Sequence, residues 1–387
     1  MRDAANLLGF AAALARGRSE RVPLVRDLAR SLEETGELRR AEELLREVAN
    51  DSGDAPSRFA FLEVASLRDY TEATEASFDA LEDAARVSDS ELDVQARAAI
   101  LDAEISWTVG KYSKMDASLT TARDVSSRLP EGPDKRSLLN TIFGWEARAI
   151  LLGKEDAAEG LKHCRRILKE ARGSHAAEAA VLAVRAGLHA MLGKVPEARR
   201  DYKRSQQIGE AFGLAAWLAA LPLYSGPAEL LAGQAADAER QLRTGYDALR
   251  RMGDKSRRAT MAAFLAHALY EQHTDGEAEK FARKSKALVA ADDAFTQVVW
   301  RGALAKVLAR RGDCENAIEL AQDAVGRAKK TDGLNLIGDA LLDQAEVLHA
   351  SGRSARKAAD EAGKWYREKG NVASEGRANA FIARLRP

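Results

Sequence analysis

The sequence predicts an all-α protein: a right-handed superhelix of about nine helical hairpins, with a leading and a closing helix. Three observations lead to this fold class. Glycines that follow apolar helical runs recur about every 40 residues, small residues stand at fixed distances from them, and no segment shows the alternation typical of a β-strand. Gly and Pro together number 36 of 387 residues, which is too few for a disordered or collagen-like chain.

The glycine rhythm marks the turn inside each hairpin. Its clearest members are Gly153, Gly193, Gly233, Gly312 and Gly352, with gaps of 40, 40, 79 and 40 residues. Glycine at such a turn supplies the left-handed backbone that ends a helix. His273 occupies the place that the long gap leaves open. Gly110 and Gly36 are earlier members, and Arg68 stands where one further turn is expected.

Small residues recur at fixed offsets from each turn and predict close helix packing. Seven positions before the turn the chain has Ala186, Gly226, Ala266, Ala305 and Ala345; five positions after it come Ala198, Ala238, Ala278 and Ala317. Small side chains there let two antiparallel helices approach each other, and let the next pair pack against them.

The helices are expected in a regular order along the whole chain, as one array over residues 1–387. Residues 3–16 form a leading helix and 371–385 a closing one. The nine units between them are expected at 21–50, 54–87, 90–128, 133–172, 175–211, 213–250, 254–290, 293–330 and 333–369. The rival architecture, two globular helical domains, predicts protease cleavage into two stable halves near Pro130 and Pro133.

Two prolines interrupt the first helix of the sixth unit. Pro222 and Pro227 lie in the segment LAALPLYSGPAELL. A proline in a helix interior removes one backbone donor and clashes with the preceding turn. The break is interpreted either as a tolerated kink or split helix, or as a hinge or ligand notch.

The repeat resembles the tetratricopeptide (TPR) pattern, lengthened from 34 to about 40 residues. The segments GELRRAEELL, ELLAGQAADAERQLRTGYDALRRMGDK and WYREKGNVASEGRANAFIARL resemble, more specifically, the C-terminal TPR region of bacterial multidomain proteins that join an adenylate or guanylate cyclase domain to an AAA/STAND-type ATPase. The resemblance implies a sensor or scaffold role in signalling. No GxxxxGK[ST] phosphate loop is present, so no catalytic or nucleotide-binding residue is carried over.

No pattern in the chain predicts an enzyme, a metal site or a cofactor. There is no HExxH, GxSxG or GxGxxG motif, and six histidines are scattered. Cys164 and Cys314 are too few for a disulfide framework or a cysteine zinc site. Because 59 basic side chains balance 59 acidic ones, nucleic acid is not an expected partner. No stretch approaches the length of a membrane span and the start lacks a credible export signal, which favours the cytoplasm.

The candidate contact surface is the concave groove between the fifth and eighth units. Offsets from the turns place small or apolar residues in its middle and polar anchors just beyond. The candidates are Ala183, Gly187, Met191, Leu223 and Leu230, followed by His267, Tyr270, Lys306 and Arg310. An amphipathic segment with an acidic end would satisfy both sets. The alternative is that the superhelix curves until it closes its own groove.

The predicted function is therefore a non-catalytic interaction and regulatory module. It would act on a protein partner or on an adjacent ATPase or cyclase domain. The competing hypothesis is a sensor that binds a small-molecule inducer inside the superhelix, as in STAND-type transcription activators. The break at Pro222 and Pro227 beside an apolar groove supports this second hypothesis. Nothing in the sequence indicates an oligomeric state.

Overall fold

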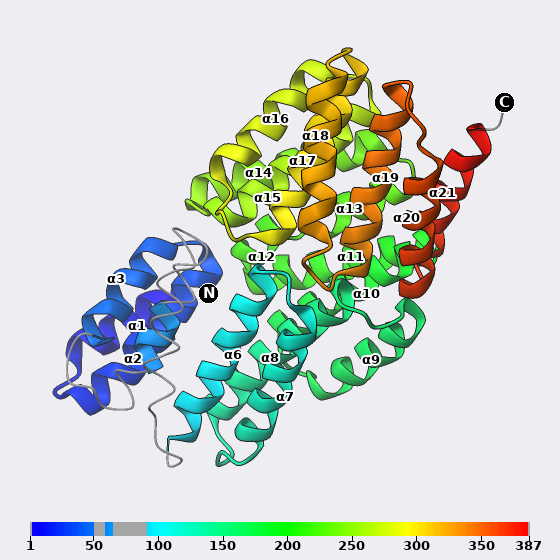
Figure 1. The fold of residues 1–387 in the computed structure, drawn as a ribbon. Coiled ribbons are helices and arrows are strands. Elements are labelled where there is room, and N and C mark those ends of the chain that lie inside the picture. Colours follow the sequence, from blue (N-terminus) through cyan, green and yellow to red (C-terminus); the bar gives the residue numbers. More distant parts are fainter. Residues whose placement is uncertain (1, 50–58, 65–90, 386–387) are drawn as a thin grey trace.

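The computed structural model of the chain describes residues 2–49, 59–64 and 91–385 (Figure 1). None of these residues forms a β-strand, and residues 59–64 are helical. Most of the expected second unit, with Arg68 at its turn, lies outside the described residues. The other expected units each contain a helical hairpin, so the all-α prediction is confirmed.

Apart from the helical residues 59–64, the described helices before the proline break form a leading helix and four hairpins. They are α1 (Arg2–Leu14), α2 (Arg18–Thr35) with α3 (Leu38–Ala49), α6 (Leu92–Thr108) with α7 (Tyr112–Ser127), α8 (Pro133–Leu152) with α9 (Ala157–Glu170), and α10 (His175–Met191) with α11 (Val195–Phe212).

The helices from the break onward form four more hairpins and a closing helix. They are α12 (Ala215–Ala220) and α13 (Pro222–Leu231) with α14 (Ala235–Met252), α15 (Lys255–Glu271) with α16 (Asp275–Leu288), α17 (Ala294–Arg310) with α18 (Cys314–Ala328), α19 (Leu334–Ala350) with α20 (Arg356–Lys369), and α21 (Val372–Arg384).

The turns follow the predicted glycine rhythm with one exception. Six of the seven predicted turn glycines have φ between 67° and 88°, and His273, where glycine is missing, takes φ 57°. Gly153 differs, with φ −78° and ψ −161°. At this turn the carbonyl oxygens of Ile150, Gly153 and Glu155 all accept hydrogen bonds from the ammonium of Lys369, so the backbone is shaped by a partner 216 residues away.

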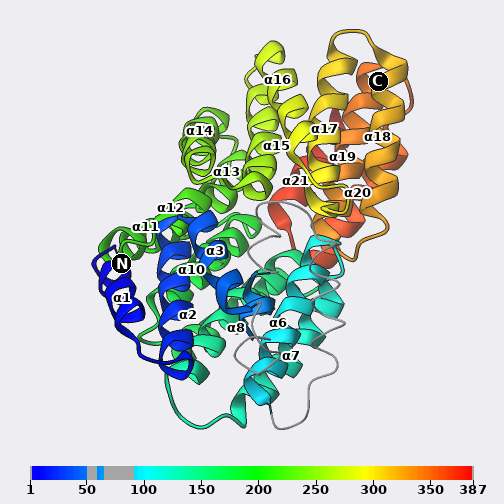
Figure 2. The same cartoon turned by 90° about the vertical axis from the view of Figure 1, so that its left-hand side faces the viewer.

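The hairpins stack into a superhelix whose last units return to its third and fourth units (Figures 1 and 2). Lys369, at the end of α20, is fully buried against the end of α8. A second contact involves Asp332, which lies between α18 and α19. Its two carboxylate oxygens accept hydrogen bonds from the first amides of α7, Tyr112 N at 2.6 Å and Ser113 N at 2.8 Å. The superhelix is therefore closed into a ring.

The N-terminal hairpin also packs across the ring. Helix α2 contacts α12, and the Gly36 turn lies against the side chain of Met252 at the end of α14. Near this contact, burial and then the neighbouring Glu34 raise the pKa of Glu33 to about 7, while Arg257 and Arg97 act in the opposite direction. The first hairpin thus packs on the ring at α12 and the end of α14.

The proline break produces two helices. Pro222 has no N–H to donate to the carbonyl of Leu218, so α12 ends at Ala220 and α13 begins at Pro222. Pro227 remains inside α13. Gly245 on α14 gives the room for this: a Cβ there would lie 3.0 Å from Pro222 Cγ. The split-helix interpretation is what the structure shows, and α13 forms part of the inner wall.

Candidate functional site

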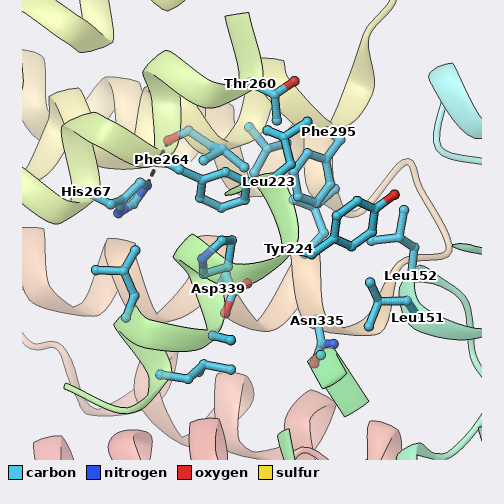
Figure 3. A pocket seen from close by; sticks show the side chains of 18 of the residues that line it. Leu151, Leu152, Leu223, Tyr224, Thr260, Phe264, His267, Phe295, Asn335 and Asp339 are labelled. Atoms are coloured by element: carbon cyan, nitrogen blue, oxygen red, sulfur yellow. Dashed lines mark hydrogen bonds between the residues drawn. The ribbon is translucent and has the colours of Figure 1, made fainter. Parts of the chain in front are cut away.

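The inner side of the ring lines a partly open cavity of about 270 Å³, which we call the central cavity. Its walls come from the third unit through to the closing helix. The residues that define it include Arg148, Leu151, Leu152, Gly187, Met191, Leu223, Tyr224, Leu230, Phe264, His267, Phe295, Val299, Lys306, Asn335, Asp339, Asp343 and Arg377. Apolar side chains dominate these walls, as is typical of sites for small ligands (Figure 3).

The apolar wall depends on the helix break. Because α13 starts anew at Pro222, it presents Leu223, Tyr224 and Leu230 to the cavity. Leu151 and Leu152, at the end of α8, face the same space (Figure 3). The main-chain carbonyl of Tyr224 accepts a hydrogen bond from Tyr202 Oη at 2.8 Å, which fixes α13 against α11.

Six of the nine residues predicted from the sequence line the central cavity. These are Gly187, Met191, Leu223, Leu230, His267 and Lys306. Ala183, Tyr270 and Arg310 are not among the lining residues. Ala183 is instead fully buried in a core cluster with Ala186 and Tyr202.

Tyr270 and Arg310 contact each other rather than the cavity. The Arg310 guanidinium lies 3.5 Å from the centre of the Tyr270 ring and donates to the Tyr270 carbonyl at 2.9 Å. It also pairs with Asp275 at 2.8 Å. Its charge is thus compensated within the chain, and it is not available as an anchor for an acidic ligand.

Lys306 is also compensated, although it lines the central cavity. Its side chain is only 2% exposed, and its ammonium lies 2.8 Å from Asp343, 3.7 Å from Glu346 and 4.0 Å from Glu271. Burial alone would lower the pKa of Lys306, but these carboxylates, Asp343 foremost, raise it above its usual value. Lys306 and these three carboxylates therefore form a structural ion cluster in the cavity wall.

His267 contributes a neutral imidazole to the same wall. Burial, with the nearby positive charge of Lys306, lowers the pKa of His267 below its usual value. Its Nε2 lies 3.0 Å from the carbonyl oxygen of Val299, the contact drawn in Figure 3. A neutral ring with Nε2 protonated donates this hydrogen bond, so the histidine tethers α15 to α17.

Arg148 is the cavity residue that the sequence reasoning missed. The offset rule selects Ala147, six positions before Gly153, but Ala147 is fully buried and Arg148 lines the cavity instead. Tyr224, one position after the predicted Leu223, also lines the cavity and was missed.

Among residues 2–49, 59–64 and 91–385, no group of three or more His, Cys, Asp or Glu could hold a metal ion. Within the same residues no helix is both long and apolar enough to cross a membrane. Cys164 is buried in a core cluster, and Cys314 begins α18.

Comparisons with known proteins agree on the fold. No protein-family model matches the chain, and no curated protein matches it in sequence. Among solved structures, the Cut9–Hcn1 hetero-tetramer of APC/C contains a chain that is 15% identical, with a TM-score of 0.57 over 99% of this chain and 73% of that one. The chain has a TPR-like fold.

Two further solved structures match this TPR-like chain over most of its length. The Rap protein complexed with Competence and Sporulation Factor is 13% identical, with a TM-score of 0.50, and the match covers 91% of this chain and 97% of that one. The phAimR–ligand structure is 10% identical, with a TM-score of 0.51, covering 98% and 97%. At these identities the likeness concerns the architecture.

Proposed function

We propose that this chain is a non-catalytic regulatory module that binds a small, largely apolar ligand inside the ring, either a short peptide or a small molecule. The observation that carries the proposal is the central cavity, whose apolar walls come from units far apart in the sequence. A ligand bound there touches both sides of the ring closure, so its binding energy favours the closed ring over an opened one.

The structural neighbours support the same choice. Rap is described in complex with Competence and Sporulation Factor, and phAimR with its ligand. The ion-paired Lys306 and Arg310 argue against an acidic end bound at these two residues, as the sequence suggested, because both cations already have carboxylate partners.

A thermal-shift screen of short apolar peptides and small organic compounds tests this proposal. A ligand should raise the melting temperature of the wild-type chain by mass action. Leu223→Trp, which fills the central cavity, should abolish the shift. Leu14→Trp, at a position on α1 that is 79% exposed, is the matched control and should retain it. A shift that is equal in all three proteins would place binding outside the cavity and overturn the proposal.

We also propose that a protein domain responds to the ligand. The resemblance of the repeats to bacterial cyclase–ATPase proteins suggests an ATPase or nucleotide cyclase domain as this partner. Sequencing the reading frame that encodes the chain, together with its neighbours, should reveal such a domain. The purified domain should then change its turnover when the chain is added with ligand; unchanged turnover would overturn this part of the proposal.

A further inference from the structure

The guanidinium of Arg148 differs from the other cations of the central cavity in having only neutral partners. Its Nε donates to Tyr224 Oη at 3.0 Å, and its Nη1 donates to the carbonyl of Gly144 at 3.0 Å. The group lies 4.6 Å from the centre of the Trp145 ring. No carboxylate of residues 2–49, 59–64 or 91–385 pairs with it.

Each of the other cations of the cavity lies close to acidic groups of the chain. Lys306 pairs with Asp343, and Arg257 pairs with the buried Asp254. Arg377, on the closing helix, is exposed, and the nearby Tyr366, Glu346, Glu271 and Asp339 favour its positive charge. Arg148 alone carries a positive charge to an apolar part of the wall, beside Leu151 and Leu152.

Tyr224 adds a second donor at the same place. Its hydroxyl oxygen accepts from Arg148 Nε, so its own hydrogen is free for another acceptor. An arginine and a tyrosine hydroxyl that both donate, with no acceptor supplied by the described part of the chain, complement a carboxylate. The leucines around them complement an apolar body.

We infer that Arg148 and Tyr224 form an anchor for a carboxylate carried on an apolar ligand. This inference rests on the proposed function and narrows it, because it gives the chemical class of the ligand. A small organic acid and the C-terminal carboxylate of a short peptide present the same group. Either would place its charge on Arg148 and its apolar part against α13 and the end of α8.

Matched acid and amide probes test the anchor. Calorimetric titration would compare 4-phenylbutyrate with 4-phenylbutyramide, and acetyl-Leu-Leu-Phe with its C-terminal amide. A charged hydrogen-bond partner predicts about 10- to 100-fold tighter binding of the acid within a pair. Preference in the first pair alone identifies a small organic acid, in the second alone a peptide terminus, and preference in both supports the shared anchor.

Variants assign the preference to these two side chains. Arg148→Gln should reduce binding of the acid to that of the amide, and Tyr224→Phe should weaken the acid about 2- to 10-fold. Arg301→Gln is the matched control: Arg301 also lies over a tryptophan, 4.3 Å from the Trp300 ring centre, but it pairs with Asp323 and does not line the cavity. It should keep the full preference.

The outcomes separate this inference from the function on which it rests. Equal binding of acid and amide by the wild-type chain overturns the anchor and leaves the ligand-binding function standing. An acid preference that survives in both Arg148→Gln and Tyr224→Phe also overturns the anchor. Failure of every probe to bind at millimolar concentration overturns both proposals. Circular dichroism checks that each variant is folded. If Arg148→Gln does not fold, the comparison of Tyr224→Phe with the wild type tests the anchor.

Discussion

Lys306 and Arg148 are two cations on the wall of one cavity, and their surroundings give them different roles. The Lys306 ammonium is buried among Asp343, Glu346 and Glu271, so its charge is neutralised before any ligand arrives. The Arg148 guanidinium has a hydroxyl, a carbonyl and a tryptophan face as its partners. A charge that faces a cavity is therefore available to a ligand only when the fold has not already compensated it.

Removing the compensated charge should have the largest effect. Lys306→Met removes the buried cation that lies among Asp343, Glu346 and Glu271, and breaking a buried ion pair from one side typically costs about 3–5 kcal/mol. We expect a loss of this size in the free energy of unfolding, measured by urea titration. Lys280→Met, an exposed lysine paired with Glu277, is the control and should stay within about 0.5 kcal/mol.

A double variant shows whether the loss comes from the orphaned acids. Lys306→Met combined with Asp343→Asn should recover part of the stability, because the closest carboxylate is then neutral. If the single variant is as stable as the wild type, the cluster is not a structural ion pair and the contrast with Arg148 is lost.

Lys369 tests a cation that is compensated by main-chain carbonyls. Its three hydrogen bonds, of 2.8, 2.8 and 2.6 Å, go to Ile150, Gly153 and Glu155 and close the ring. Lys369→Met keeps the aliphatic stem but leaves these acceptors buried, which predicts a loss of about 2–3 kcal/mol. The exposed Lys364 on the same helix provides the control, Lys364→Met.

Ring opening is the specific consequence to measure. Small-angle X-ray scattering should show a larger radius of gyration for Lys369→Met than for Lys364→Met if the contact holds the superhelix closed. An unchanged radius together with unchanged unfolding would mean that the hydrogen bonds from Tyr112 N and Ser113 N to Asp332 are sufficient to close the ring.

The sequence predicted the repeating part of this fold well, because repetition is a local property. Turn glycines, small packing residues and the left-handed turn at His273 all follow from the 40-residue rhythm. Ring closure could not be predicted from the sequence. It depends on contacts such as that of Lys369 with Gly153, 216 residues apart, and on the rotation between successive units added up over the whole array. No sequence pattern gives that total rotation.

In the candidate site too, the sequence predicted what depends on local repetition and missed what depends on contacts between units. Offsets from the turns found Gly187, Met191 and His267 on the inner wall, since these positions share one helix face. They missed Arg148 and Tyr224, which stand one position after the offset residues Ala147 and Leu223, because side chains beside the expected positions also reach the cavity. They also could not show that Arg310 is already paired with Asp275, because pairing is a property of neighbouring units.

Glu33 is a carboxyl group whose surroundings disfavour its charge, and its replacement should have an effect on stability between those of Lys369 and Arg148. Burial and Glu34 raise its pKa to about 7, from 4.5 in an unfolded chain. Ionisation therefore costs more in the folded state, and the stability that this group contributes falls as pH rises from about 4.5 to 7. Glu33→Gln should exceed the wild type by about 1–2 kcal/mol at pH 8 and match it at pH 4.5.

Urea titrations at the two pH values check this prediction. The exposed Glu37→Gln, which follows the same turn, is the control and should show no such difference. A gain that is equal at both pH values would mean that the variant acts through helix propensity or packing rather than through charge.

The smallest effect on stability is expected for the uncompensated cation. Arg148→Gln removes a charge that no carboxylate of the described residues pairs with, so it leaves no orphaned acid. Its lost hydrogen bonds go to Tyr224 Oη, which faces the cavity, and to Gly144 within the same helix. We therefore expect the free energy of unfolding to change by at most about 0.5 kcal/mol. Arg301→Gln, which leaves Asp323 without one of its two arginines, should cost at least as much. A loss above about 2 kcal/mol for Arg148→Gln would show that the guanidinium is part of the core, and the distinction between the two cations of the cavity would fail.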